Sequence, residues 1–278
     1  MPEHNTLQAL NSRRFGGIAR LYGDDGLARL LQAHVCVIGI GGVGSWVAES
    51  LARSAVGEIT LIDLDVVSES NINRQLVATT DTIGRDKGLV MQERIKQINP
   101  QCSVNFIDEF VSNDNLSELI LPEFDYVIDC IDDFRTKAAL INYCRQQKIK
   151  ILTVGGAGGQ CDPLKIKQCD LSRTKQDVLL ARTRKLLRQD YGFARNIKRS
   201  FGVPCVYSDE QLVYPDGLGG VGQQRPATDP NEASGQRNAL NCAGGMGSIT
   251  HVTGAFAFIA SGFVITKIAT QISTQIAT

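Results

Sequence analysis

The stretch "VCVIGIGGVGSWVAES", residues 35–50, carries the pattern that decides the fold. Its apolar first part has the length of a buried strand, and glycines follow at Gly39, Gly41 and Gly44, where a helix-like segment begins. In such a turn the first glycine permits a sharp bend, the second lets a phosphate approach the backbone, and the third lets the helix pack closely on the sheet. The pattern predicts a phosphate-binding turn, with a ligand-free glycine turn as the alternative interpretation.

Strand-like and helix-like segments alternate from this stretch up to residue 154. The alternation predicts a doubly wound, Rossmann-like α/β fold with a mostly parallel sheet covered on both faces. The regular pattern then ends, so we expect a nucleotide-binding core at residues 1–160 and a C-terminal extension of the same domain at residues 161–278. The predicted strands are 35–40, 58–63, 103–107, 125–130 and 150–154, and the predicted helices are 43–53, 86–98 and 135–147.

The composition is that of a globular protein with ample core, because 43% of the 278 residues are hydrophobic and 21% are charged. The formal net charge is zero, so no overall field attracts nucleic acid or an anionic membrane, and we expect no DNA partner. The segment 173–199 differs locally, since nine Lys/Arg occur there with two Asp. This basic block predicts either a surface for RNA phosphates or a solvated helix face.

Eight cysteines are present without a C-x-x-C pair, which argues against a zinc ribbon. The N-terminus lacks the regions of a secretory signal, so we expect a cytoplasmic protein with reduced thiols. Cys205 and Cys242 are predicted to be small core side chains, with redox activity as the alternative. The apolar segment 244–265 has the length of a membrane span, but its glycines, hydroxyl groups and His251 favour a buried helix.

The residues after the glycine turn indicate the type of nucleotide. Asp63 ends the next predicted strand, nineteen residues after Gly44, where a carboxylate meets a ribose hydroxyl. Up to this point a nicotinamide-dependent dehydrogenase is still possible. Asn71, Arg74 and Lys87 then add polar and positive groups. An added Arg and Lys suggest a triphosphate whose leaving pyrophosphate needs charge neutralisation.

A group of acids follows a predicted strand in the sequence "DCIDDF", residues 129–134. Ligands of open α/β sheets bind at the carboxyl ends of the strands, and a carboxylate there could hold Mg²⁺ against the phosphates. Spacing alone leaves Asp129, Asp132 and Asp133 as candidates.

Five motifs occur in order along the chain: Gly39–Gly44, Asp63/Asp65, Ser70-Asn71 with Arg74-Gln75, Lys87, and Asp129/Asp132. This order resembles the adenylating enzymes related to ubiquitin activators and to the molybdopterin- and thiamine-pathway adenylyltransferases. The resemblance extends from about residue 14 to residue 154, and more weakly to the end of the chain. It implies ATP and Mg²⁺ as cofactors and adenylation of a substrate carboxylate.

The resemblance also implies a role for each residue of these motifs. Arg74, Lys87 and Asp132 would be catalytic, and Asp132 would also be the Mg²⁺ ligand. Arg14 would act as an arginine finger across a homodimer interface; Arg13 and Arg20 are alternatives for this role, and an ordinary surface arginine is the other interpretation. The nucleotide would be bound by Gly39, Gly41, Gly42, Gly44, Asp63, Asn71 and Gln75.

Within this family the chain is more similar to a bacterial tRNA-modifying branch, which cyclises threonylcarbamoyladenosine in an ATP-dependent loss of water. The implied partner is tRNA that carries this nucleoside, and the implied assembly is a homodimer with its interface and substrate site in residues 161–278. The resemblance also implies a protein of a cysteine-desulfurase system as a second candidate partner. The similar segments are 13–23, 39–46, 71–75, 155–163, 170–179, 212–217 and 240–250.

Three other functions remain open. An activator of a small sulfur-carrier protein would adenylate a C-terminal Gly-Gly peptide, but enzymes of that type usually hold zinc with paired C-x-x-C motifs. A nicotinamide-dependent oxidoreductase would bind its cofactor without releasing pyrophosphate. A catalytically inactive RNA-binding relative would show neither AMP transfer nor nicotinamide binding. The complete set of Arg74, Lys87 and Asp132 argues against an inactive protein.

Overall fold

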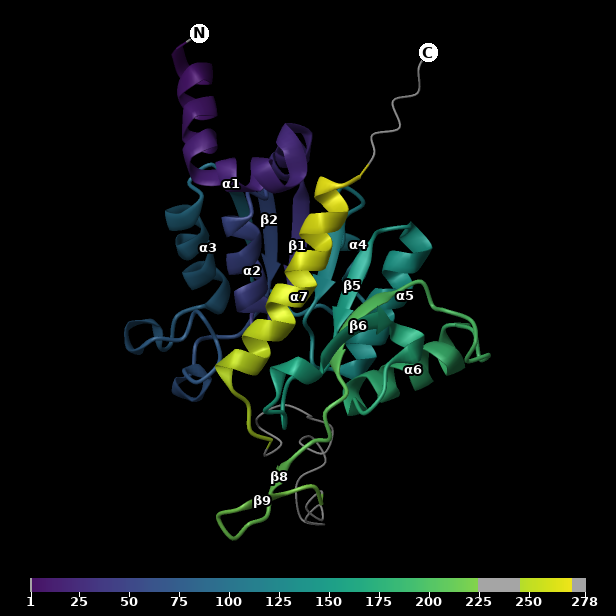
Figure 1. The fold of residues 1–278 in the computed structure, drawn as a ribbon. Helices are drawn as coiled ribbons and strands as arrows, with labels where there is room; N and C mark the ends of the chain where they lie inside the picture. The colour runs from purple at the N-terminus through teal and green to yellow at the C-terminus, as the bar shows by residue number, and fades with distance from the viewer. Residues whose placement is uncertain (1, 225–245, 272–278) are drawn as a thin grey trace.

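A seven-stranded sheet with helices on both faces forms the centre of the computed structural model (Figure 1). The structure describes residues 2–224 and 246–271, and their side chains from residue 13 onward. The strands of the sheet are β1 His34–Ile38, β2 Glu58–Ile62, β3 Ser103–Ile107, β4 Tyr126–Asp129, β5 Ile151–Val154, β6 Ile166–Asp170 and β7 Pro204–Ser208. Their order is β3-β2-β1-β4-β5-β7-β6, and only the edge pair β6–β7 is antiparallel. The doubly wound α/β prediction is confirmed.

Helices cover the two faces of this sheet in separate groups. The helices are α1 Pro2–Gln32, α2 Gly44–Arg53, α3 Lys87–Ile98, α4 Leu116–Leu119, α5 Phe134–Gln147, α6 Val178–Asp190 and α7 Thr250–Ala269. Helices α2, α3 and α7 pack on one face, and α4, α5 and α6 pack on the other. A small ribbon of β8 Tyr214–Pro215 and β9 Val221–Gly222 lies outside the sheet.

Strand β1 shows why the sheet is buried on both faces. Its side chains alternate, so that Val35 and Val37 enter the core under α2 and α7, whereas Cys36 and Ile38 enter the core under α4 and α5. All four side chains are at most 2% exposed. A strand that is buried on both faces has an unbroken apolar sequence, and this explains why the run could be recognised.

The predicted strands and helices between residues 35 and 154 agree with the observed elements to within two residues at each end. The expectation that the regular pattern ends at residue 154 is wrong, because β6 and β7 extend the same sheet. Strand β6 lies at the edge and exposes Lys167 and Gln168, so its sequence lacks an apolar run. The sheet therefore includes residues on both sides of position 160.

The predicted apolar helix is α7, which packs against α2. Val252, Phe256, Ala260 and Val264 recur every four residues, and each is completely buried in the core. Within the described residues, α7 is long and apolar enough to cross a membrane, but 61% of its most apolar window is buried inside the fold. The prediction of a buried helix is confirmed for α7, and a cytoplasmic location stays a prediction.

Candidate active site

The glycine turn joins β1 to α2 beside the end of β4. Gly39 has φ +86°, and a Cβ atom there would lie 3.1 Å from the carbonyl oxygen of Cys130. A Cβ atom on Gly44 would lie 1.8 Å from the carbonyl oxygen of Gly39, so the turn closes only with glycine there. Gly41 has no such close neighbour and lines the pocket. The N–H of Ser45 donates to the carbonyl of Gly41 (3.2 Å), but the first turn of α2 contains no acid and no side-chain cap, so this end of the helix favours an anion.

A cavity of about 750 Å³ opens above this turn, at the carboxyl ends of the strands. It extends to both sides of the point where β1 lies between β2 and β4, the place at which α/β folds of this type bind ligands. Ten of the eleven predicted site residues border it or its turn: Gly39, Gly41, Gly42, Gly44, Asp63, Asn71, Arg74, Gln75, Lys87 and Asp132. The volume is sufficient for a nucleotide and part of a second substrate.

Asp63 lies directly after β2 and is 9% exposed. One of its carboxylate oxygens accepts a hydrogen bond from the N–H of Ile40 (2.5 Å), and the other accepts from the N–H of Asp65 (2.8 Å). Burial raises the pKa of the Asp63 carboxyl above its usual value, while the nearby Lys87 and the two N–H groups oppose this. Each carboxylate oxygen keeps a second lone pair, which a ribose hydroxyl could use.

Asn71, Arg74 and Gln75 lie on one side of the pocket. The Asn71 side chain accepts a hydrogen bond from the N–H of Ser68 (3.1 Å), which fixes the short helical turn that carries it. The Arg74 guanidinium donates to the carbonyl of Ser70 (2.6 Å). Gln75 is 7% exposed, and its Oε1 has no hydrogen-bond partner among the residues that the structure describes. The group therefore offers a cation and a free acceptor to a ligand.

Lys87 begins α3 and is 5% exposed. Its Nζ donates to the carboxylate of Asp65 over 2.7 Å, and Asp65 itself is exposed. This contact aims the ammonium group into the pocket beside Asp63. A lysine held in this way can meet phosphate charge without a large change in its own position.

The structure separates the three acids after β4. Asp133 is the N-cap of α5 and accepts hydrogen bonds from the N–H groups of Arg135 and Thr136 (3.0 and 2.8 Å). Asp129 is completely buried. Asp132 lines the pocket, is exposed, and has no hydrogen bond or ion pair within the described part of the chain. Its carboxylate alone among the three is free to approach a cation.

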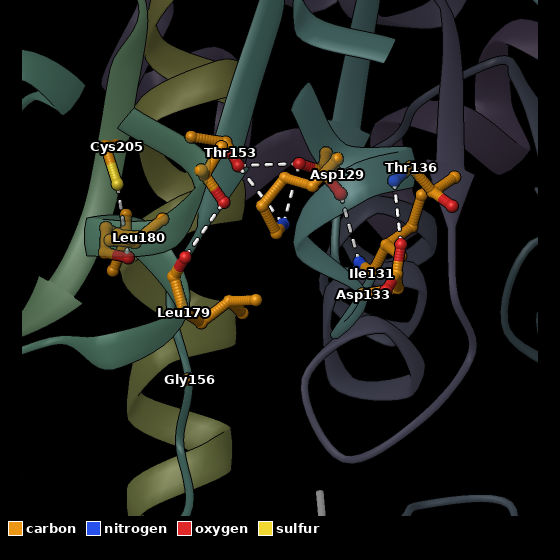
Figure 2. Close-up of polar contacts among 12 residues, drawn as sticks. Asp129, Ile131, Asp133, Thr136, Thr153, Gly156, Leu179, Leu180 and Cys205 are labelled. Carbon is orange, nitrogen blue, oxygen red and sulfur yellow. Dashed lines mark hydrogen bonds and ion pairs between the residues drawn. The ribbon is translucent and has the colours of Figure 1, made fainter. Parts of the chain in front are cut away.

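Asp129 belongs to a buried polar cluster below the pocket. Figure 2 shows the hydroxyl of Thr153 and the carboxylate of Asp129 pointing toward each other, with a donor–acceptor distance of 2.6 Å. Lys137 from α5 is also completely buried and donates to the same carboxylate oxygen (2.7 Å). The other oxygen accepts from the N–H of Ile131 (3.0 Å), so the cluster fixes the turn that presents Asp132.

A second glycine-rich segment, residues 155–160, follows β5 and borders the other half of the cavity. A Cβ atom on Gly155 would lie 2.1 Å from a carboxylate oxygen of Asp177, the N-cap of α6. That carboxylate accepts hydrogen bonds from the N–H groups of Gly156 (2.9 Å) and Leu180 (2.8 Å), and burial raises its pKa. Sequence reasoning assigned no site residue here, although a glycine-rich turn at a strand end was a usable signal.

Arg14 lies away from the cavity. Its guanidinium donates to the carbonyl of Ile98, the last residue of α3, over 2.6 Å. Lys87 begins this twelve-residue helix in the pocket, so Arg14 lies about 16 Å away along the helix axis. The position is compatible with the predicted role only if Arg14 acts on the pocket of a second copy.

The buried cysteines described by the structure have raised thiol pKa values. Cys205 and Cys36 are completely buried, and burial raises the pKa of each thiol well above its usual value. Burial raises the pKa of Cys130 and Cys144 to about 12. Thiols of this kind are poor nucleophiles. Cys242 lies outside the described residues.

The basic block divides into interior and exposed members. Arg182 and Arg188 on α6 lie over the rings of Phe134 and Phe201, at 5.7 and 5.1 Å from the ring centres, and Arg184 contacts the Thr174 hydroxyl. These three half-buried arginines stabilise the packing of α6. The exposed members are Arg173, Lys175, Lys185, Arg195, Lys198 and Arg199.

Comparison with known proteins places the chain in a family. The ThiF family model matches residues 16–275, nearly the whole chain. The chain belongs to the ThiF family. A ThiF-family relative from Haemophilus influenzae, tRNA threonylcarbamoyladenosine dehydratase, is 51% identical over 256 residues, which are 92% of this chain and 93% of that protein.

The Escherichia coli enzyme of the same name is 48% identical over 263 residues, 95% of this chain and 96% of that protein. The crystal structure of the E. coli enzyme TcdA in complex with ATP has a TM-score of 0.80 at 46% identity, covering 92% of this chain and 94% of that one. The similarity to these ThiF-family enzymes extends over the core and the C-terminal segments alike. A relative with the same fold therefore binds ATP.

Proposed function

We propose that this protein catalyses the ATP-dependent dehydration of N6-threonylcarbamoyladenosine in tRNA through an adenylated carboxylate. One observation carries the proposal: a single cavity brings together Asp63, Asn71, Arg74, Lys87 and Asp132. The end-to-end similarity to dehydratases that share this fold supports the choice of substrate.

The reaction has two steps in this proposal. A carboxylate oxygen of the threonyl group attacks the α-phosphorus of ATP, and pyrophosphate leaves. An internal nucleophile of the same nucleoside then attacks the acyl carbon, closes the ring and expels AMP, which keeps the carboxylate oxygen. The net result is loss of one water from the nucleoside, coupled to cleavage of ATP to AMP and pyrophosphate. No protein nucleophile is required, in agreement with the buried thiols of Cys36 and Cys205.

Each residue of the nucleotide half has a defined task. Asp63 accepts hydrogen bonds from the ribose, and the N–H groups at the start of α2 bind the phosphates. Arg74 and Lys87 stabilise the negative charge that develops on the leaving pyrophosphate, where fixed cations are most effective. Asn71 and Gln75, which also line the pocket, position the nucleotide.

Asp132 is the residue that would hold Mg²⁺. The chemistry of the site fits this ion, because an exposed carboxylate without an internal partner faces the pocket and Mg²⁺ prefers one or two carboxylates plus phosphate oxygens. When bound, the ion would neutralise phosphate charge. No group of three or more His, Cys, Asp or Glu that could hold a metal by itself occurs among the described residues, which agrees with a site shared with the nucleotide.

A homodimer would give Arg14 access to a nucleotide. We assign the interface and most of the substrate site to residues 161–278, and the N-terminal helix, which carries Arg14, to the interface. In a symmetric dimer, Arg14→Ala protein mixed with Lys87→Ala protein forms hybrid dimers with one intact site each. Mixing and re-equilibrating two inactive variants should then restore about a quarter of the wild-type activity. An inactive mixture that contains hybrid dimers would contradict the trans role of Arg14.

The exposed members of the basic block would contact the tRNA backbone, since phosphate contacts need solvent-facing cations. Arg195, Lys198 and Arg199 lie together in the segment after α6, and Lys185 lies on the exposed side of α6. The cysteine-desulfurase partner stays a prediction.

The test of the function is incubation of the purified protein with ATP, Mg²⁺ and tRNA that carries threonylcarbamoyladenosine, followed by mass analysis of the nucleosides. The proposal expects an ATP-dependent decrease by the mass of one water. The alternative, activation of a small sulfur-carrier protein, expects no change in the nucleoside and AMP transfer to a Gly-Gly terminus instead. Unchanged nucleoside under conditions of full ATP binding would refute the dehydratase function.

A further inference from the structure

The cavity has two halves of different chemical character. The half over β1, β2 and β3 contains the cations and Asp63, which the proposed function assigns to ATP. The half over β5 and the start of α6 is bordered by the second glycine-rich segment and by the apolar side chains Leu179, Leu212 and Met246. The buried acid Asp177 lies on the same side. An apolar wall beside an acid disfavours phosphate and suits an uncharged group.

Among the residues that the structure describes, Gln160 is the polar side chain of this half that keeps an unpaired buried atom. It lines the cavity and is only 4% exposed. Its Nε2 donates to the carbonyl of Gly156 over 2.9 Å, which fixes the orientation of the amide. Its Oε1 then has no hydrogen-bond partner within residues 2–224 and 246–271. Leaving a buried acceptor unpaired is unfavourable, so this oxygen is available to a hydrogen-bond donor of a bound ligand.

The backbone around Gln160 holds this acceptor in place. The N–H of Gly159 donates to the carbonyl of Gly247 (2.7 Å), and the carbonyl of Gly159 accepts from the N–H of Val213 (2.9 Å). Gly159 has φ +72°, and a Cβ atom there would lie 3.1 Å from the carbonyl oxygen of Val213. The segment is thus tied to two others on either side, and Gln160 is presented from a rigid support.

The substrate of the proposed function carries a suitable donor. A threonylcarbamoyl group on adenosine has two ureido N–H groups. The N–H next to the threonine can close a six-membered ring onto N1 of the purine by an internal hydrogen bond. The N–H on the purine side then points outward and needs an acceptor.

We propose that Gln160 is a specificity-determining residue, whose Oε1 accepts the purine-side ureido N–H and thereby selects the threonylcarbamoyl nucleoside. The inference rests on the proposed function and adds a residue to it. The hydrogen bond holds the substrate in the half of the cavity over β5, from which its carboxylate reaches the nucleotide half. A substrate that lacks this N–H leaves the buried Oε1 unpaired and is rejected.

The experiment compares tRNA bearing threonylcarbamoyladenosine with tRNA in which the purine-side ureido N–H is replaced by N-methyl. Pyrophosphate release in the first turnover is measured at limiting tRNA, because adenylation precedes ring closure and does not depend on the reactivity of that nitrogen. The variants are Gln160→Met, which removes the acceptor, and Gln160→Glu, which keeps an acceptor oxygen. Gln168→Met, at an exposed position of β6, is the matched control.

The wild type and the Gln168→Met control should adenylate the methylated substrate about 5–150-fold more slowly than the normal one, the range for one unpaired buried acceptor. Gln160→Met should act on both substrates at similar rates, and Gln160→Glu should retain discrimination. Equal rates for the two substrates in the wild type would overturn the inference. It would also be overturned if Gln160→Met discriminated between the substrates as strongly as the wild type, or if both Gln160 variants lost this discrimination. If wild-type protein fails to dehydrate the normal substrate, the proposed function itself is overturned and the inference with it.

Discussion

Lys137→Met is the substitution whose effect follows most directly from the buried cluster below the pocket. Lys137 and Asp129 are both 0% exposed, and 2.7 Å separates the ammonium nitrogen from the carboxylate oxygen. Methionine keeps the length of the side chain and removes the charge. Asp129 then keeps its hydrogen bonds from Thr153 and Ile131 but loses its only ion-pair partner among the described residues.

Breaking a buried ion pair by removing one partner costs about 3–5 kcal/mol, because the remaining charge stays buried without compensation. A loss of that size is a large share of a typical unfolding free energy of about 5–15 kcal/mol. It corresponds to a decrease in melting temperature of roughly 10 °C for a domain of this size class. The measurement is urea and thermal unfolding of both proteins at neutral pH.

The matched control is Lys150→Met, which changes an exposed lysine before β5 and should alter the unfolding free energy by less than about 0.5 kcal/mol. The double variant Asp129→Asn/Lys137→Met removes both charges and should recover more than half of the lost stability. The reasoning would be refuted if Lys137→Met were as stable as the control, or if the double variant were no more stable than Lys137→Met.

Three further results are expected. In a pyrophosphate-release assay, Asp132→Asn should lose most adenylation activity and regain part of it at raised Mg²⁺ concentration. Asp133→Asn should stay active, because asparagine also caps a helix. An inactive Asp133→Asn with an active Asp132→Asn would show that Asp133 is the metal ligand. ATP affinity, measured by calorimetry across pH, should fall on acidification as Asp63 becomes protonated, because ribose binding needs the ionised carboxylate. Since burial raises the pKa of Asp63, the fall should begin above the ordinary aspartate pKa of 3.8. An ATP affinity that stays constant down to pH 3.8 would contradict this role. Lys185→Glu with Lys198→Glu should weaken tRNA binding and flatten its salt dependence without changing ATP affinity, and an unchanged salt slope would exclude these residues from the tRNA surface.

The nucleotide half of the site could be predicted from the sequence because its residues lie close to conspicuous patterns. The apolar run before Gly39 identifies β1, and Asp63 follows the next apolar run. In a parallel sheet the ends of such strands meet at one edge, so order along the chain was sufficient to place Gly41, Asp63 and Lys87 at one pocket.

The rest depended on contacts between distant segments. Lys137 binds Asp129 and the N–H groups of α5 bind Asp133, so that, within the described residues, only Asp132 of the three acids after β4 is free. These contacts could not be predicted from the spacing of the acids in the sequence. The second glycine-rich segment becomes part of the pocket only because β5 lies beside β4 in the sheet. Similarly, Arg182 and Arg188 count as basic residues in the sequence, yet they pack on aromatic rings in the fold.

The central claim is that the substrate carboxylate is adenylated, and isotope transfer tests it most directly. The threonyl carboxylate of the tRNA nucleoside is labelled with heavy oxygen, and the protein is supplied with ATP and Mg²⁺. Because the carboxylate oxygen attacks the α-phosphorus and leaves with it, one heavy oxygen should appear in AMP for each nucleoside that loses water. Heavy oxygen in inorganic phosphate with formation of ADP, or product formation with unlabelled AMP, would contradict the account.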